Sequence, residues 1–313
     1  MQDPQTERLV GADQAAENEA PVHRRRVLII LNPAAGRPWS SRRLLDRVIA
    51  ALERRGCVVV VRRTGPTSGD AERLAREAEP DFDIIVAAGG DGTINTVANG
   101  MAGTPRPLAL VPLGTANVLA REIGLPRRPE ALAELIAAGP ARLIWPGRVG
   151  DRLFLTMASS GFDAATVAVV NPRLKRYLGR AAFAWAIAVC LWRYRPSELR
   201  VEVDGADHRA ATVIAAKGRF YAGPHVIAPQ ADLADPMLDL VLFQRSGRLM
   251  VLRYLGALLL DRVPRRGDIT FLRSRGALVS GPDCVPVQAD GEIVARLPVS
   301  IGIADQPLQL VRP

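Results

Sequence analysis

Three glycines and one acidic residue stand together directly after a short apolar run in the first third of the chain. The segment reads Gly89-Gly90-Asp91-Gly92-Thr93, and it follows the run from Asp83 to Ala88. Glycines permit positive φ and let a ligand approach the bare backbone. A strand that leads through such a turn into a helix points backbone N–H groups at a phosphate. The turn therefore predicts phosphate binding, and the alternative is a tight turn that binds no ligand.

The acid in this turn has two interpretations. Asp91 can orient a magnesium-bound water near phosphate oxygens, or it can cap the following helix. The other residue types that commonly carry chemistry are scattered, namely Cys57, Cys190, Cys284, His23, His208 and His225. Their spacing fits neither a zinc site nor a disulfide framework. We expect free thiols in a reducing compartment and no nucleophile–base pair built on histidine.

The elements around the turn alternate between strands and helices. Apolar runs predict strands over residues 27–31, 57–61, 83–88 and 108–111, and apolar residues at helical spacing predict helices over residues 40–55, 70–78 and from Thr93 onward. This alternation predicts a parallel sheet with both faces covered. Ligands of such sheets bind beyond the carboxyl ends of the strands. Asn32, Thr64 and the Gly89–Thr93 turn all follow strands, so we expect them to converge.

The pattern changes after Pro140. Short runs with β character are separated by turn signals such as Asp204-Gly205, which predicts an antiparallel sheet or sandwich. Two helical segments interrupt these runs, at residues 172–195 and 248–261. The predicted fold class is α/β plus β-rich: a disordered tail at 1–21, an N-terminal parallel α/β nucleotide-binding domain at 22–140, and a C-terminal antiparallel β-sandwich-like domain at 141–313.

The composition narrows the class of partner. The chain has 313 residues with 48% hydrophobic content, enough for a sizeable core, and a net charge of +9. Its only lysines are Lys175 and Lys217, so the positive charge is nearly all arginine. Anionic partners such as a nucleotide or a membrane surface fit this charge, whereas the 5% aromatic content does not favour nucleic acid. The N-terminus lacks the apolar stretch of a signal peptide, so we expect a cytoplasmic protein.

Six motifs occur in an order that is specific in combination. They are Asn32-Pro33-Ala34-Ala35-Gly36, Gly89–Thr93 with Asn99-Gly100, Pro112–Asn117, Gly161-Phe162-Asp163, Ala228–Asp235 and Asp290-Gly291-Glu292. With them the chain resembles, from about Arg26 to its end, the diacylglycerol kinase catalytic family, which includes bacterial lipid kinases, sphingosine kinases and ceramide kinases. NAD kinases share the GGDGT turn alone.

The resemblance implies an ATP-dependent lipid kinase with its site between the two domains, the second domain taking the lipid. The ATP phosphates would lie on the glycine turn, and the nucleotide site would comprise Asn32, Thr64, Gly89, Gly90, Asp91, Gly92, Thr93, Ile94, Asn95 and Thr115. Asp290 would be the general base on the lipid hydroxyl, with Glu292 supporting the site. The alternative for Asp290-Gly291 is a hairpin turn. Asn117 is either a helix-start residue or a ligand contact.

The resemblance also implies a structural magnesium ion, Mg²⁺, held by Asp232, Asp235 and the backbone oxygen of Met237. Two residues depart from the family pattern here. Pro236 follows Asp235 where the family usually has glycine, and proline lacks an N–H and fixes φ. Lys217 stands where asparagine is commoner, and we interpret it as structural. The proline puts the magnesium site in question, although the carboxylate of Asp235 is retained.

The apolar run Ala181–Trp192 is too short to span a bilayer. It predicts either a buried helix or a lipid-facing surface. The flanking basic residues suit the interface of an anionic membrane and equally suit a solvated rim; they are Arg173, Lys175, Arg176, Arg180, Arg193 and Arg195. We expect a cytoplasmic enzyme peripheral to the inner face of the membrane, with no nucleic-acid partner. Nothing in the sequence decides whether it forms a homodimer.

Two other functions fit parts of the sequence. One is an NAD kinase-like enzyme with a soluble acceptor, which would not need lipid vesicles. The other is a non-catalytic regulatory protein that binds nucleotide or lipid. The retained Asp91 and Asp290 argue against this second function. Within the lipid kinase prediction a diacylglycerol-like substrate is favoured. Sphingoid base, ceramide and phosphatidylglycerol stay open, because pocket shape decides among them.

Overall fold

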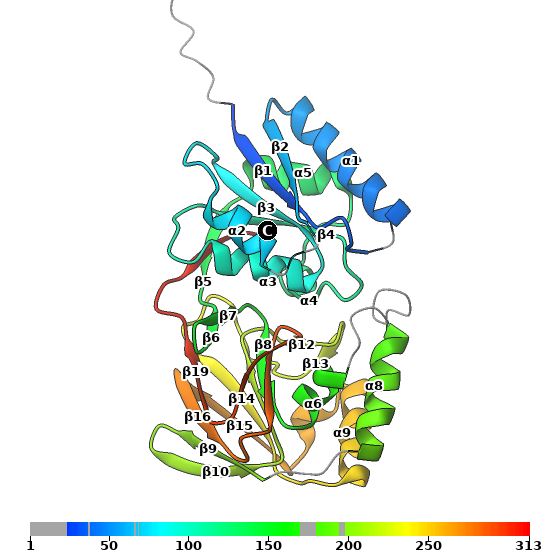
Figure 1. Cartoon of the computed structure of the whole chain (residues 1–313), viewed down its shortest axis with the longest axis vertical. Coiled ribbons are helices and arrows are strands. Elements are labelled where there is room, and N and C mark those ends of the chain that lie inside the picture. Colours follow the sequence, from blue (N-terminus) through cyan, green and yellow to red (C-terminus); the bar gives the residue numbers. More distant parts are fainter. Residues whose placement is uncertain (1–23, 37, 66, 68, 170–179, 194–197) are drawn as a thin grey trace, which may run out of the picture.

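The computed structural model describes residues 24–36, 38–65, 67, 69–169, 180–193 and 198–313 (Figure 1). The tail predicted at 1–21 lies outside this part of the chain. So do Arg173, Lys175, Arg176, Arg195 and the side chain of Arg180. Figure 1 shows two bodies along the long axis, an α/β body that holds the first four strands and a β-rich body below it.

The first body is built on a sheet with the strand order β2-β1-β3-β4-β20-β5. Its strands are β1 (Arg26–Leu31), β2 (Val58–Arg63), β3 (Ile84–Gly89), β4 (Leu108–Pro112), β5 (Ala141–Ile144) and β20 (Leu308–Val311). All neighbouring pairs are parallel except β20 with β5. The last strand of the chain therefore returns to the first sheet. Both β5 and β20 lie beyond residue 140, so the domain boundary proposed there remains a prediction.

Helices cover both faces of this sheet. They are α1 (Pro38–Arg54), α2 (Asp70–Arg76), α3 (Asp91–Gly100), α4 (Val118–Glu122) and α5 (Pro129–Ala138). Alternate residues of β3 pack in two different hydrophobic clusters: Ile85 lies with α2 and α3, whereas Ile84 lies with α1 and α5. Every residue of β3 is buried as a result. This explains why the strand reads as an unbroken apolar run.

The second body is a sandwich of two antiparallel sheets. One has the order β10-β9-β16-β19-β6-β7 and the other β15-β14-β11-β8-β17-β18. The bounds of the first are β6 (Gly147–Val149), β7 (Arg152–Phe154), β9 (Leu199–Val203), β10 (Ala206–Ala210), β16 (Gly276–Ser280) and β19 (Val299–Ile303). Those of the second are β8 (Met157–Ser160), β11 (Thr212–Ala216), β14 (Leu238–Phe243), β15 (Ile269–Ser274), β17 (Pro286–Ala289) and β18 (Glu292–Arg296).

The two sheets share a core of alternating residues. In β9 the burial alternates strictly, so Val201 points into the cluster between the sheets while Arg200 and Glu202 point to solvent. The second sheet is covered on its other face by α6 (Phe162–Val169), α8 (Arg180–Arg193), α9 (Arg248–Leu259) and the 3-10 helix Val263–Arg265 (Figure 1). A small ribbon, β12 (Phe220–Tyr221) with β13 (His225–Val226), completes the body. The predicted fold class is confirmed.

None of the helices in the described part of the chain combines the length and apolar character that crossing a membrane requires.

Candidate active site

The predicted phosphate turn lies between β3 and α3, where the two bodies meet. Its glycines serve close approach, because Gly90 is extended (φ −89°, ψ −178°) and none of the turn glycines has positive φ. A Cβ built on Gly114 would lie 2.6 Å from the Cα of Gly90, and one on Gly89 would lie 2.4 Å from the Cβ of Thr93. Of the two properties that glycine offers, positive φ and close approach, this turn therefore uses close approach.

The N-terminus of α3 carries no side-chain cap. Its first backbone N–H groups are therefore available to an anion, and the helix dipole favours negative charge there. Ile94 contributes no side chain to such a site, since it is 1% exposed within the core and its N–H donates to the carbonyl oxygen of Gly90 (3.0 Å). What the turn offers to a ligand is its backbone.

The polar residues predicted beside the turn are partly brought together. Asn32 donates from Nδ2 to the Thr93 hydroxyl (2.9 Å), which joins the first motif to the turn. Thr64 follows β2 one strand further out, and its N–H donates to the carbonyl of Leu31 (2.9 Å). Thr115 is exposed in the loop after β4, next to Gly114. All four lie at the carboxyl ends of parallel strands, as ligand-binding residues of such sheets do.

Asp91 caps a neighbouring helix. Its Oδ1 accepts the backbone N–H of Val118, the first residue of α4 (2.7 Å). Burial raises the pKa of Asp91, N–H groups at the start of α4 lower it, and the nearby Asp290 carboxylate raises it. Of the two predicted roles, the structure therefore supports capping, although of α4 and not of α3. The contact ties the second motif to the third.

Asp290 reaches this junction from the second body. It occupies the left-handed region (φ 46°) at the turn between β17 and β18. Its carboxylate accepts hydrogen bonds from five donors: the Asn95 side chain (2.8 Å), the Thr156 hydroxyl, and the N–H groups of Leu155 (2.6 Å), Thr156 (3.0 Å) and Met157 (3.0 Å). A carboxylate has about four lone-pair sites. Asp290 therefore has little acceptor capacity left for a substrate.

Asn95 extends this network into the first body. Its Nδ2 also donates to the carbonyl of Leu153 (2.9 Å), and the N–H of Leu153 donates to Oδ1 of Asn99 (2.9 Å). Asn95 and Asn99 are both buried on α3. They therefore fasten α3 to the strand segment that Asp290 also holds. Asn95 was predicted in the nucleotide site, and its contacts here are with the protein.

Glu292 presents the free carboxylate of the site. It is the first residue of β18 and is exposed, and within the described residues no hydrogen bond or ion pair engages its carboxylate. Its Oε1 lies 3.0 Å from the position that a Cβ on Gly92 would take, so it faces the glycine turn. The buried Gln288 holds the connecting turn by accepting the N–H of Gly291 (2.8 Å). A free carboxylate thus stands beside the uncapped start of α3.

The three predicted magnesium ligands converge on an ammonium group. Nζ of Lys217 donates to the backbone oxygens of Asp232 (2.9 Å), Asp235 and Met237 (2.9 Å). The side chain of Asp235 is paired with Arg273. No group of three or more His, Cys, Asp or Glu side chains suited to a metal ion occurs in the described ranges. The residues present therefore do not fit a magnesium ion at this point.

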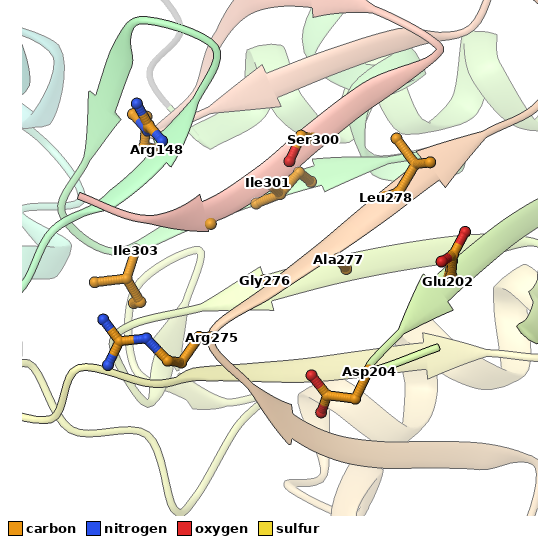
Figure 2. A pocket seen from close by; sticks show the side chains of 11 residues that line it. Arg148, Glu202, Asp204, Arg275, Gly276, Ala277, Leu278, Ser300, Ile301 and Ile303 are labelled. Carbon is orange, nitrogen blue, oxygen red and sulfur yellow. The ribbon is translucent and has the colours of Figure 1, made fainter. Parts of the chain in front are cut away.

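A separate hollow of about 420 Å³ lies over the sheet of the second body that contains β9, β16 and β19 (Figure 2). Figure 2 shows Arg148 and Arg275 on one side of it and Glu202 and Asp204 on the other. None of the residues predicted for the site lines it. It is therefore not the site that the motifs build.

Sequence reasoning did not identify two features of the junction. One is the segment Leu153–Met157, whose backbone groups bind the Asp290 and Asn95 side chains, and no sequence signal marks such backbone contacts. The other is the position of the Lys217 ammonium. A signal for it existed, because Lys217 is one of only two lysines in a chain whose other basic residues are arginine and histidine.

The chain was compared with known families and structures. Residues 26–149 match the diacylglycerol kinase catalytic domain, and residues 156–312 match the YegS C-terminal NAD kinase beta sandwich-like domain. The chain is similar to a diacylglycerol kinase of Mycobacterium tuberculosis, with 32% identity over 92% of this chain and 95% of the relative. It is also similar to one of Bacillus subtilis, with 31% identity over 88% of this chain and 92% of the relative.

A further lipid kinase is similar in sequence, and a solved structure is similar in fold. A probable lipid kinase YegS-like of Pseudomonas putida is 37% identical over 72% of this chain and 75% of the relative. A crystal structure of a diacylglycerol kinase from Bacillus anthracis has the same fold, with a TM-score of 0.73 at 22% identity over 92% of this chain and 97% of that one. The chain therefore belongs to the diacylglycerol kinase catalytic domain family and is a lipid kinase, a phosphotransferase with an alcohol acceptor.

Proposed function

We propose that the protein transfers the γ-phosphate of ATP to the hydroxyl of a diacylglycerol-like membrane lipid. The observation that carries this proposal is the free Glu292 carboxylate of the second body beside the uncapped start of α3 in the first. In the reaction the lipid oxygen bonds to the γ-phosphorus, the bond to the bridging β–γ oxygen breaks, and ADP leaves. The hydroxyl proton passes to a carboxylate.

The nucleotide site follows from the turn. Phosphate oxygens would accept the N–H groups at the start of α3, with Asn32, Thr93, Thr64 and Thr115 lining the same edge of the sheet. The sequence has no lysine in a glycine-rich phosphate loop, since Lys175 follows no such loop, and Lys217 is buried in the second body. Mg²⁺ that enters with ATP would neutralise charge on the phosphates. Asp91 caps α4 through Oδ1, and as the acid of the turn it remains the candidate to orient a water of that ion.

The general base is the point on which sequence and geometry differ. The sequence favoured Asp290, but its carboxylate is engaged by five protein donors. This supports a positioning role, in which Asp290 holds Leu155–Met157 against α3. The unengaged carboxylate of Glu292, two positions further along the chain, supports Glu292 as the base. Asp290 remains the alternative.

The acceptor class is tested by offering the two candidate acceptors in separate reactions. With labelled ATP and vesicles of total lipid extract, we expect label in a lipid that migrates and weighs as a phosphorylated diacylglycerol. With NAD in place of vesicles we expect no labelled product. The Glu292→Gln protein is the matched control for contaminating kinases. Transfer to NAD without vesicles would favour the NAD kinase-like function, and ATP binding without transfer to either acceptor would favour the regulatory one.

The apolar helix of the second body supports a membrane-facing surface. One side of α8 is buried, with Ala186 at 1% and Cys190 at 4% exposure, where it packs near α6 and α9. The other side exposes Trp185 (62%) and Trp192 (80%). The neighbouring α9 and the residue after it expose Leu249, Leu252, Leu259 and Leu260. α8 thus has one buried side, and its exposed aromatic side supports a lipid-facing surface.

Basic residues accompany these apolar side chains, as anionic membranes favour. Exposed arginines on the same elements are Arg193, Arg248 and Arg253. We propose that this surface docks the enzyme on an anionic membrane, at the inner face where ATP is present. Large exposed aromatic residues beside arginine suit the headgroup region, because the rings enter the acyl boundary while the charges meet lipid phosphates.

A double variant tests the docking surface. Trp185→Ser with Trp192→Ser should reduce sedimentation with anionic vesicles at least threefold, because it removes the largest exposed rings. Leu143→Ser is the matched control, since Leu143 is 54% exposed on β5 in the other body. Binding of the wild type should also weaken as salt rises. Sedimentation that is equal for the double variant and the control, or independent of lipid charge, would contradict the assignment.

A further inference from the structure

We propose that the ammonium group of Lys217 takes the place of a structural divalent cation in this chain, so that the segment Asp232–Met237 is held without metal. The resemblance to the lipid kinase family implies magnesium at this segment. The residues found there instead build a closed site around a side-chain cation.

All three N–H donors of the Lys217 ammonium group are hydrogen-bonded. The residue follows β11 and is 1% exposed. A lysine ammonium has three donors, and Nζ donates to the three backbone oxygens of Asp232, Asp235 and Met237. The Lys217 N–H donates to the carbonyl of Thr156 (2.8 Å), which fixes the start of the side chain. No donor of the ammonium is left over for another ligand.

The carboxylates that a divalent cation would need are engaged elsewhere. Asp235 pairs with Arg273, and Oδ1 of Asp232 accepts the N–H of Ala234 (2.9 Å). Magnesium and calcium take six or more oxygen ligands, normally with carboxylates among them. Among the described residues, the oxygens that accept hydrogen bonds from Nζ are all carbonyls, which suit a single charge. Pro236 fixes the backbone between two of them without an N–H of its own.

The charge balance also fits an ammonium ion. Burial lowers the pKa of Lys217 to about 8, with Asp232 and Asp239 acting in the opposite direction. Three hydrogen bonds from Nζ to carbonyl oxygens require three N–H donors, and only the protonated amine has three, so the geometry itself assigns the charge. A divalent ion entering the same space would be repelled by the like charge of the ammonium group.

The segment held in this way joins the two bodies. Leu233 is 3% exposed and packs in the cluster of the first body that contains Ile94 and Val97 of α3. Its carbonyl oxygen accepts the N–H of Trp145 (2.8 Å), beside β5. Lys217 thus supports one of the contacts that join the two bodies. Its loss should weaken the fold without touching the glycine turn.

The test compares melting temperatures without nucleotide in EDTA, Mg²⁺ and Ca²⁺ at matched ionic strength. The wild type should melt at the same temperature in all three. Lys217→Met should melt about 5 to 10 °C lower, because three buried carbonyls lose their donor. Lys217→Asn supplies an oxygen ligand, so it should melt low in EDTA and recover at least half of the loss in millimolar Mg²⁺ or Ca²⁺.

Bound metal provides a second readout that needs no variant. After dialysis into metal-free buffer without nucleotide, the wild-type protein should retain no stoichiometric magnesium or calcium by elemental analysis. Retention of one ion per chain would overturn the proposal, even if neither Lys217 variant folds. So would a Lys217→Met protein that melts within about 1 °C of the wild type in EDTA, because the ammonium would then support nothing.

Discussion

A Glu292→Gln enzyme is expected to bind ATP as the wild type does and to transfer phosphate about a hundred- to ten-thousandfold more slowly, the usual range for loss of a general base. Glutamine keeps the length of the side chain but cannot take the hydroxyl proton. The fold should be unaffected, because Glu292 is exposed and its carboxylate has no protein partner within the described residues. The measurement is kcat with lipid vesicles, alongside an ATP titration and a melting curve.

Asp290→Asn is the matched comparison and should fail differently. Its side-chain amide has one oxygen in place of two, and its NH₂ group would face N–H donors. Leaving a buried donor unpaired costs about 1 to 3 kcal/mol, and each kcal/mol lowers the melting temperature of a chain this long by about 2 to 4 °C or less. Asp290→Asn should therefore lose stability as well as rate. If it lost only rate while Glu292→Gln kept kcat within a few-fold, Asp290 would be the base.

The parallel sheet could be predicted because local pattern and tertiary context agree there. Strands β1, β3 and β4 are covered on both faces, so burial leaves an unbroken apolar run in the sequence. The motif residues Asn32 and Thr93 were expected to converge for a general reason, since parallel strands end at one edge, and they are hydrogen-bonded. In these places the sequence records the environment of each residue directly.

Other features depend on contacts between distant residues, which leave no local pattern. β20 joins the first sheet by pairing with β4 and β5 from the end of the chain. The donors around Asp290 come mostly from backbone N–H groups more than 130 positions away, and any residue type can supply those. From the sequence of α8 we could predict only that the helix is apolar. Which side is buried and which is exposed depends on where α6 and α9 pack against it.

The glycine turn provides the second large effect. Gly90→Val should weaken ATP binding at least a hundredfold, about 2.7 kcal/mol, while the protein still folds. The backbone of Gly90 is extended, which any residue adopts, and a Cβ there would meet only the Cα of Gly114, at 3.4 Å. The added methyl groups would therefore enter the space between the turn and the 113–115 loop, where the phosphates are proposed to lie. Calorimetric titration with ATP measures the loss.

Gly114→Ala separates this effect from damage to the fold. Its Cβ would lie 2.6 Å from the Cα of Gly90 and 2.8 Å from Oδ1 of Asn117, so backbone has to move. Gly114→Ala should lower the melting temperature by several degrees. Gly90→Val should lower it by less, although valine is the bulkier residue. If Gly90→Val melted at a lower temperature than Gly114→Ala, the added side chain at position 90 would be contacting protein and not the space proposed for the ligand. A folded Gly90→Val protein with wild-type ATP affinity would remove the phosphates from this turn, and with them the reason for Glu292 to act beside it.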